Sequence, residues 1–185
     1  MPSLSPVALA AVVTCALLSG CGRPEAPRLP ERPAAGWRAE GLATFGPDEL
    51  KALLPPDGAR EALVVALWAH WCDPCIEELP ELTALAAANP EWGVLSLVTD
   101  DLGSASTATR VQAVLERVKP THAQGRIAPG GEHRLLSALG LQWEGILPKA
   151  FVLVRGDVLR AFDLHARTRD ELVLEVKNRL RGAAP

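Results

Sequence analysis

Residues Ala66 to Leu82 read ALWAHWCDPCIEELPEL and hold two cysteines, Cys72 and Cys75, separated by two residues. The pair follows a short apolar run and precedes a stretch in which leucines recur. Two cysteines so placed can bind a metal, close a structural disulfide, or exchange electrons with the disulfide of another protein. The rest of the chain has to discriminate among these three uses.

The segments on either side of the pair have different periodicities. Ala62 to Ala69 is a continuous apolar run, ALVVALWA, which is typical of a central strand buried on both faces. Between Cys75 and Asn89 the leucines recur at helical spacing. Cys72 is therefore expected where a buried strand ends and a helix begins.

The remaining chain continues this alternation of strands and helices. Further strands are predicted at Gly93 to Asp101, Lys149 to Val154 and Asp157 to Phe162, and helices at Asp48 to Leu54, Ala105 to Lys119 and Glu132 to Leu139. A last helix opens with Thr168-x-x-Glu171, a capping box. The order predicts an α/β fold, a central mixed sheet flanked by helices, with a parallel half and a closing antiparallel hairpin.

The chain has 185 residues, of which 48% are hydrophobic, and this suits one globular domain, expected at 39–183, plus extra segments. The net charge of −3 and the lack of a long basic cluster argue against nucleic acid as a partner.

The first 21 residues, MPSLSPVALAAVVTCALLSGC, contain no charged side chain. The apolar stretch from Val7 to Leu18 has the length of a signal-peptide core and is too short to span a bilayer. The following Leu18-Ser19-Gly20-Cys21 resembles the bacterial lipobox, which implies removal of residues 1–20 and lipidation of Cys21. The alternative is an ordinary secretory leader cleaved nearby. Cys15 leaves with the leader in either case.

Prolines recur at every third residue in the segment 21–38, at Pro24, Pro27, Pro30 and Pro33. Three residues is the period of the polyproline II helix, so this segment is expected to be a stiff, solvated tether with a reach of roughly 45 Å. The alternative is a plain disordered linker with the same role.

If Cys21 carries lipid, only Cys72 and Cys75 remain as thiols in an exported chain whose compartment permits disulfides. A four-cysteine zinc site is then impossible, and no histidines are paired in a metal-like spacing. An inert disulfide across two residues closes too small a loop to stabilise much. Electron exchange is the use that remains favoured, with no cofactor beyond the cysteine pair.

A cysteine at a helix N-terminus is suited to attack. Free N–H groups and the helix dipole favour the thiolate at Cys72, which is the attacking species in disulfide exchange. Cys75 lies one turn later and is placed to resolve the mixed disulfide. Pro74 suits the first turn, where its missing N–H costs nothing.

The segment WAHWCDPCIEELP resembles the thioredoxin superfamily, and within it the membrane-tethered TlpA/ResA-like thiol–disulfide oxidoreductases. The shared pattern W-x-x-W-C-x-P-C-x-x-E-x-P is matched by Trp68, Trp71, Cys72, Pro74, Cys75, Glu78 and Pro80. Far downstream, GILPKAF resembles the segment in which this family carries a cis-proline facing the cysteines. Pro148 would be that proline, with Leu147 offering its backbone to a substrate strand; the alternative is a trans proline that begins an edge strand.

The acidic residues near the pair carry the finer predictions. Thioredoxins proper have a buried Asp where this chain has Ala66, whereas Glu78 stands where the TlpA/ResA-like branch has its acid. Glu78 could shuttle the proton of Cys75, or it could simply complement the helix dipole.

Trp71, Asp73 and Pro74 are the expected redox-tuning positions around the pair. Asp73, between the cysteines, should disfavour the Cys72 thiolate and make the pair a reductant, unless its side chain points into water. His70 is expected to be a surface residue outside the site.

The resemblance implies a thioredoxin-like fold and an extracytoplasmic, lipid-anchored oxidoreductase of the bacterial envelope, facing the periplasm or the exterior. Its implied partners are oxidised envelope proteins such as apocytochrome c, and a membrane electron donor of the DsbD/CcdA type. Three alternatives remain: a peroxiredoxin-like peroxidase, a Sco-like metal chaperone, and a binding module that has kept the fold but lost the redox activity.

Overall fold

The computed structural model describes residues 28–54, 60–155, 159–165 and 168–183. A five-stranded sheet has the order β3-β2-β1-β4-β5. The strands are β1 (Ala62–Trp68), β2 (Trp92–Val98), β3 (Ala123–Arg126), β4 (Lys149–Arg155) and β5 (Leu159–Leu164). The helices are α1 (Pro47–Ala52), α2 (Asp73–Ala88), α3 (Ala105–Val118), α4 (Glu132–Ala138) and α5 (Arg169–Ala183), with a short 3₁₀ helix, η1, at Ala39–Gly41.

The sheet is mixed, as the sequence predicts. Strand β1 runs parallel to β2, and β2 runs parallel to β3. Strand β4 pairs antiparallel with β1 on its other side, and β5 completes the hairpin. The pairing of the predicted hairpin is confirmed, while its turn at residue 156 lies outside the described residues.

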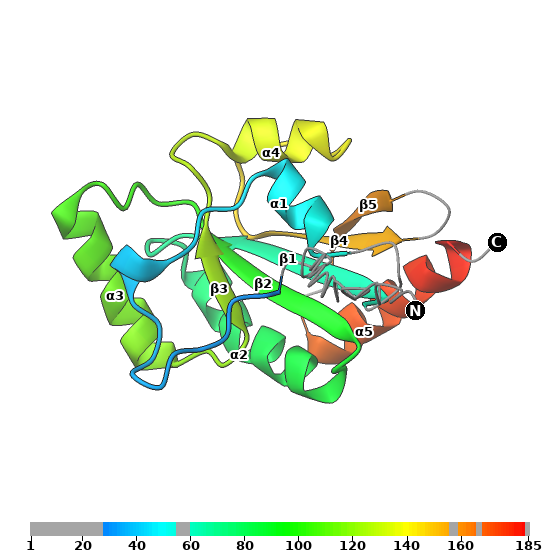
Figure 1. Ribbon diagram of the computed structural model, residues 1–185, viewed down its shortest axis with the longest axis horizontal. Helices are drawn as coiled ribbons and strands as arrows, with labels where there is room; N and C mark the ends of the chain where they lie inside the picture. The colour runs from blue at the N-terminus through cyan, green and yellow to red at the C-terminus, as the bar shows by residue number, and fades with distance from the viewer. Residues whose placement is uncertain (1–27, 55–59, 156–158, 166–167, 184–185) are drawn as a thin grey trace, which may run out of the picture.

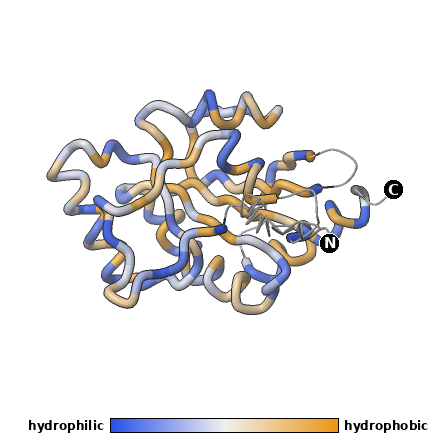
Figure 2. The backbone as a smooth tube through the Cα atoms, viewed as in Figure 1, coloured by the Kyte–Doolittle hydropathy of each residue, from blue (hydrophilic) through white to orange (hydrophobic). Residues whose placement is uncertain are grey.

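Helices cover both faces of the sheet, because each strand alternates its side chains between two cores. Val64, Ala66 and Trp68 of β1 face a core that is completed by α2, α3 and α5. The intervening residues of β1 face a second core with α1 and α4. Figure 1 shows α1 and α4 above the sheet and α2, α3 and α5 below it, and Figure 2 shows the apolar strands between these layers.

The predicted elements are observed with small shifts at their ends. Strand β2 stops at Val98 rather than Asp101, and α2 begins at Asp73 rather than Cys75. The capping box of α5 is formed as expected: Thr168 N–H donates to Glu171 at 3.1 Å, and Glu171 N–H donates to Thr168 Oγ1 at 3.4 Å.

The leader, Cys15, Cys21 and the first part of the predicted tether lie outside the described residues. Between Arg28 and Arg38 the chain contacts the domain through Leu29 and Trp37, whereas residues 31–35 are exposed, and the tether over 21–38 stays a prediction. Leu29 packs against the core shared with α1 and α4, and Trp37 is buried and donates from Nε1 to Pro120 O at 3.1 Å. Removing these two apolar side chains from water favours contact over extension. Among the described helices, none is long and apolar enough to cross a membrane.

A buried polar cluster lies between the sheet and α2. His122, only 4% exposed, contacts Thr83 Oγ1 through Nδ1 at 2.9 Å and Ser96 Oγ through Nε2 at 2.8 Å. Gln124 Nε2 lies 2.9 Å from the same Nε2. Burial lowers the pKa of His122 from 6.5 to about 3, because the protonated ring would lose its hydration.

This cluster predicts an acid-sensitive fold. The unfolded chain takes up a proton at His122 before the folded chain does, so the free energy of unfolding should decrease as the pH falls below 6.5. The contribution of this one group has a limiting slope of about 1.4 kcal/mol per pH unit. Denaturant unfolding at several pH values should show a weaker dependence for His122→Gln, which does not ionise in this range. Equal slopes for the variant and the wild type would contradict the assignment.

Candidate active site

Strand β1 leads directly into the cysteine pair. The strand ends at Trp68, and the chain then turns at Ala69 to Cys72, where Cys72 N–H donates to Ala69 O at 3.1 Å. Helix α2 begins at the next residue, Asp73. Cys72 is therefore the N-cap of α2, four residues after the end of the central strand.

Cys72 and Cys75 form a disulfide, with their Cα atoms 5.3 Å apart. Cys72 is 5% exposed and Cys75 is 2% exposed, and both belong to the core that α2, α3 and α5 complete. The structure therefore represents the oxidised state of the pair. In this state the site can accept two electrons, and in the reduced state it can donate them.

The sulfur of Cys72 takes the place of the usual side-chain oxygen at the helix N-cap. The N–H of Cys75 donates to Cys72 Sγ at 3.3 Å. Pro74, at the second helical position, has no N–H to offer. An N-cap acceptor satisfies one free donor of the first turn, and the positive end of the helix dipole adds to the attraction for negative charge. After reduction, the same contacts favour a thiolate on Cys72.

The second predicted motif lies at the same end of β1. The Leu147–Pro148 peptide bond is cis. Lys149, which follows it, pairs with Leu67 of β1, one residue before the strand ends. Leu147 packs against the core that contains both cysteines. Two segments that are more than 70 residues apart in the sequence are therefore brought to one edge by strand pairing.

Two large apolar side chains near this edge are open to solvent. Trp71, directly before Cys72, is 64% exposed, and Ile146, directly before Leu147, is 65% exposed. Burying such side chains against a partner is favourable, so they offer apolar contact area next to the disulfide.

The predicted acidic residues are placed as follows. Asp73 is exposed at the first position of α2, and Glu78 is half-buried one turn after Cys75. Ala66 lies in the same core as the cysteines, so no acid comes from that position of β1. The proposed roles of Asp73 and Glu78 remain predictions.

His70 was expected at the surface, and this expectation is wrong. Its side chain is only 15% exposed, and its Nδ1 lies 2.8 Å from Asp100 Oδ1. Its backbone N–H also donates to Asp100 Oδ2 at 2.7 Å. The available signal was that Asp100 follows strand β2, since parallel neighbours deliver the residues after their carboxyl ends to one edge.

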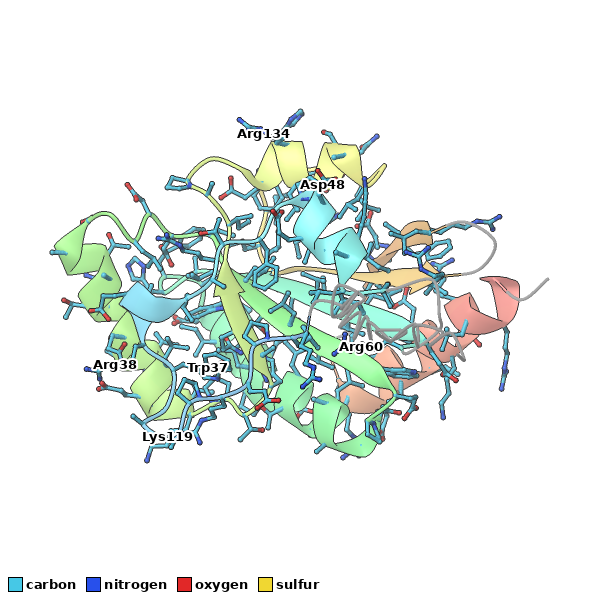
Figure 3. All side chains as sticks on the ribbon, in the orientation of Figure 1. Trp37, Arg38, Asp48, Arg60, Lys119 and Arg134 are labelled. Carbon is cyan, nitrogen blue, oxygen red and sulfur yellow. A yellow bond between two sulfur atoms is a disulfide. The ribbon has the colours of Figure 1, made fainter. Side chains whose placement is uncertain are left out.

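Three surface hollows in the described part of the chain have linings that do not include the cysteines. One is lined by Trp37, Arg38 and Lys119, and another is lined by residues of α1 and α4, including Arg134. Figure 3 labels these four side chains. Within the described ranges, His, Cys, Asp and Glu form no group of three that could hold a metal ion.

Comparison with solved structures identifies the fold. No protein-family model and no curated protein matches the chain. A thioredoxin-related protein from Neisseria meningitidis serogroup B superposes with a TM-score of 0.55 at 18% identity, over 66% of this chain and 87% of that chain. The chain has the thioredoxin fold. A DsbF homologue from Corynebacterium diphtheriae gives a TM-score of 0.51 at 18% identity, over 66% and 74% of the two chains. The thioredoxin-like fold predicted from the two motifs is confirmed.

The geometry predicts unequal reactivity of the two thiols. In the reduced protein, limiting iodoacetamide at about neutral pH should label Cys72 before Cys75, because the thiolate is the reactive species and forms preferentially at the helix N-cap. Both cysteines lie in one tryptic peptide, 61–110, so tandem mass spectrometry, from fragment ions that separate Cys72 from Cys75, would give the ratio. Cys72→Ser, as the control, should slow total labelling strongly. Equal labelling of both sulfurs would refute the assignment of Cys72 as nucleophile.

Proposed function

We propose that this protein is a thiol–disulfide oxidoreductase that acts on disulfides of other proteins. The observation that carries the proposal is the disulfide at the N-terminus of α2, with Cys72 Sγ accepting from Cys75 N–H, in a thioredoxin fold. The cis-Pro148 segment at the same edge supports it. Exposed Trp71 and Ile146 supply an apolar surface for the partner.

The reaction proceeds in two exchanges. The Cys72 thiolate attacks one sulfur of the partner's disulfide, a new S–S bond forms, and the partner's other sulfur leaves as a thiolate. Cys75 then loses its proton and attacks Cys72 Sγ, which releases the partner's first sulfur and restores the Cys72–Cys75 disulfide. From dithiol to disulfide, the oxidoreductase loses two electrons and two protons. From disulfide to dithiol, the partner gains the same number of each. Glu78, one turn from Cys75, is the group that we assign to receive the proton of Cys75.

We assign the reducing direction to this pair. A carboxylate at Asp73, exposed at the start of α2, opposes the charge of a Cys72 thiolate and so destabilises the reduced form. A dithiol whose thiolate is less stable is the better electron donor. The resemblance of Leu18-Ser19-Gly20-Cys21 to the lipobox supports our proposal that this chemistry takes place outside the cytoplasm, on a membrane-anchored lipoprotein. Oxidised envelope proteins such as apocytochrome c are its substrates, and a membrane reductase of the DsbD/CcdA type is its electron donor.

The activity is tested by combining turnover with trapping. Purified wild-type protein with dithiothreitol should accelerate the precipitation of insulin chains, whereas Cys72→Ser should not. Cys75→Ser should hold partners as mixed disulfides through Cys72, visible as bands that disappear on reduction. The double variant with both cysteines replaced is the control. If wild-type protein gave no rate above dithiothreitol alone and Cys75→Ser formed no adduct, the proposal would be rejected.

The direction of electron flow has its own test. Replacing Asp73 by Asn removes the repulsion and should raise the reduction potential, by about 10–20 mV for an exposed charge at this range. Equilibration with glutathione buffers measures the shift. Glu77→Asn, an exposed carboxylate further along the same helix, is the matched control and should change the potential less. An unchanged potential in Asp73→Asn would remove Asp73 from the account of direction.

A further inference from the structure

The turn that carries Cys72 is bound to the end of the neighbouring strand by one carboxylate. Asp100 lies two residues beyond β2, and both of its oxygens contact a single residue of the turn, His70. Oδ2 accepts the backbone N–H of His70 at 2.7 Å, and Oδ1 lies 2.8 Å from His70 Nδ1. A carboxylate oxygen only accepts, so Nδ1 carries the proton in this pair.

These contacts continue the pairing of β1 with β2 beyond the strands themselves. The ladder ends at Trp68 opposite Val98. The next bond runs from Thr99 N–H to Trp68 O at 2.9 Å, and the two Asp100 contacts follow. The turn is therefore held as an extension of the sheet, although it has no strand structure.

Burial strengthens the two contacts between Asp100 and His70, which we call the Asp100 clamp. The side chain of Asp100 is 5% exposed and that of His70 is 15% exposed. Charge-assisted hydrogen bonds gain strength where water is excluded, and a buried carboxylate that lost its partners would be costly. Neither group takes part in the exchange steps proposed above. A role for the two residues is indicated by the turn that they hold, because this turn contains Trp71 and ends at the nucleophile, Cys72.

We propose that Asp100 is a positioning residue for Cys72, acting through His70. This inference rests on the proposed function only in taking Cys72 as the attacking sulfur. Two acceptor contacts on one residue fix both the backbone and the ring of His70, which leaves the turn from Ala69 to Cys72 little freedom to rotate. When reduction opens the disulfide, the turn loses one of its constraints, and the Asp100 contacts keep Cys72 at the N-terminus of α2. Attack needs the sulfur in line with the target disulfide, and a displacement of about 1 Å can slow a reaction on the order of a hundredfold.

The test measures the rate of Cys72 itself, on reduced protein reacting with 5,5′-dithiobis(2-nitrobenzoic acid) in single turnover. Asp100→Ala should lower the second-order rate constant by about tenfold or more, because it removes both contacts. Asp100→Asn should recover part of the loss, since its amide oxygen still accepts the His70 N–H. His70→Ala, which keeps only the backbone contact, should lie between Asp100→Ala and wild type. Asp101→Ala is the matched control: the side chain of this exposed neighbour accepts from Gly103 N–H at 2.9 Å, away from the His70 turn, and the rate of the variant should stay within about twofold of wild type.

The rates are compared at a temperature at which each variant is folded by circular dichroism. A purely structural role would lower the melting temperature of Asp100→Ala and leave its rate within about twofold of wild type, and that result would overturn the inference. If Asp100→Ala does not fold, Asp100→Asn and His70→Ala decide, and wild-type rates in both would overturn it. Slow variants alongside a wild type that fails to reduce insulin would sustain the positioning role and reject the proposed function.

Discussion

Strand β1 has no exposed residue, and the rest of the molecule is arranged around that burial. A strand covered on both faces needs a layer of helices on each side and a hydrogen-bonded neighbour along each edge. Strand β2 satisfies one edge in parallel and β4 satisfies the other in antiparallel register. The mixed sheet follows from this requirement. The position of the cysteines follows as well. The chain leaves the buried strand at its end, and the turn that carries Cys72 leads from there into α2.

Three separate structural features meet at the end of β1 where the cysteines lie. The helix contributes its N-terminal N–H groups and dipole, the β1–β2 edge contributes the Asp100 clamp on the turn, and β4 brings the cis-Pro148 segment. Each acts through a different physical interaction: electrostatic attraction for a thiolate, hydrogen bonding of backbone and ring, and backbone pairing. Their common effect is to present one sulfur atom in a defined place. The polar cluster around His122 lies under the same helix but contacts none of these groups, and it belongs to the core.

The predictions from sequence succeeded where a local pattern has only one structural solution. The continuous apolar run gave β1 almost residue for residue, and Thr168 with Glu171 gave the cap of α5. The same reasoning extended β2 to Asp101, because a polar residue that follows an apolar run carries no mark of where pairing stops. His70 was misplaced for a related reason. A histidine between two apolar residues is compatible with either exposure or burial, and only a partner from another strand distinguishes the two.

The sequence by itself determined the alternation of strands and helices and the cysteine pair at a helix N-terminus, and the resemblance of two motifs to a known family supplied the thioredoxin fold. Such features depend on spacing within a single element, which the order of residues encodes directly. Tertiary structure decided which distant residues meet where no motif predicts the contact: Asp100 with His70, and Leu29 with the core. These contacts depend on strand register and on how loops close over long separations. A single sequence specifies neither the register nor the loop closure, because many other pairs of residues of the same types could form the same kinds of contact.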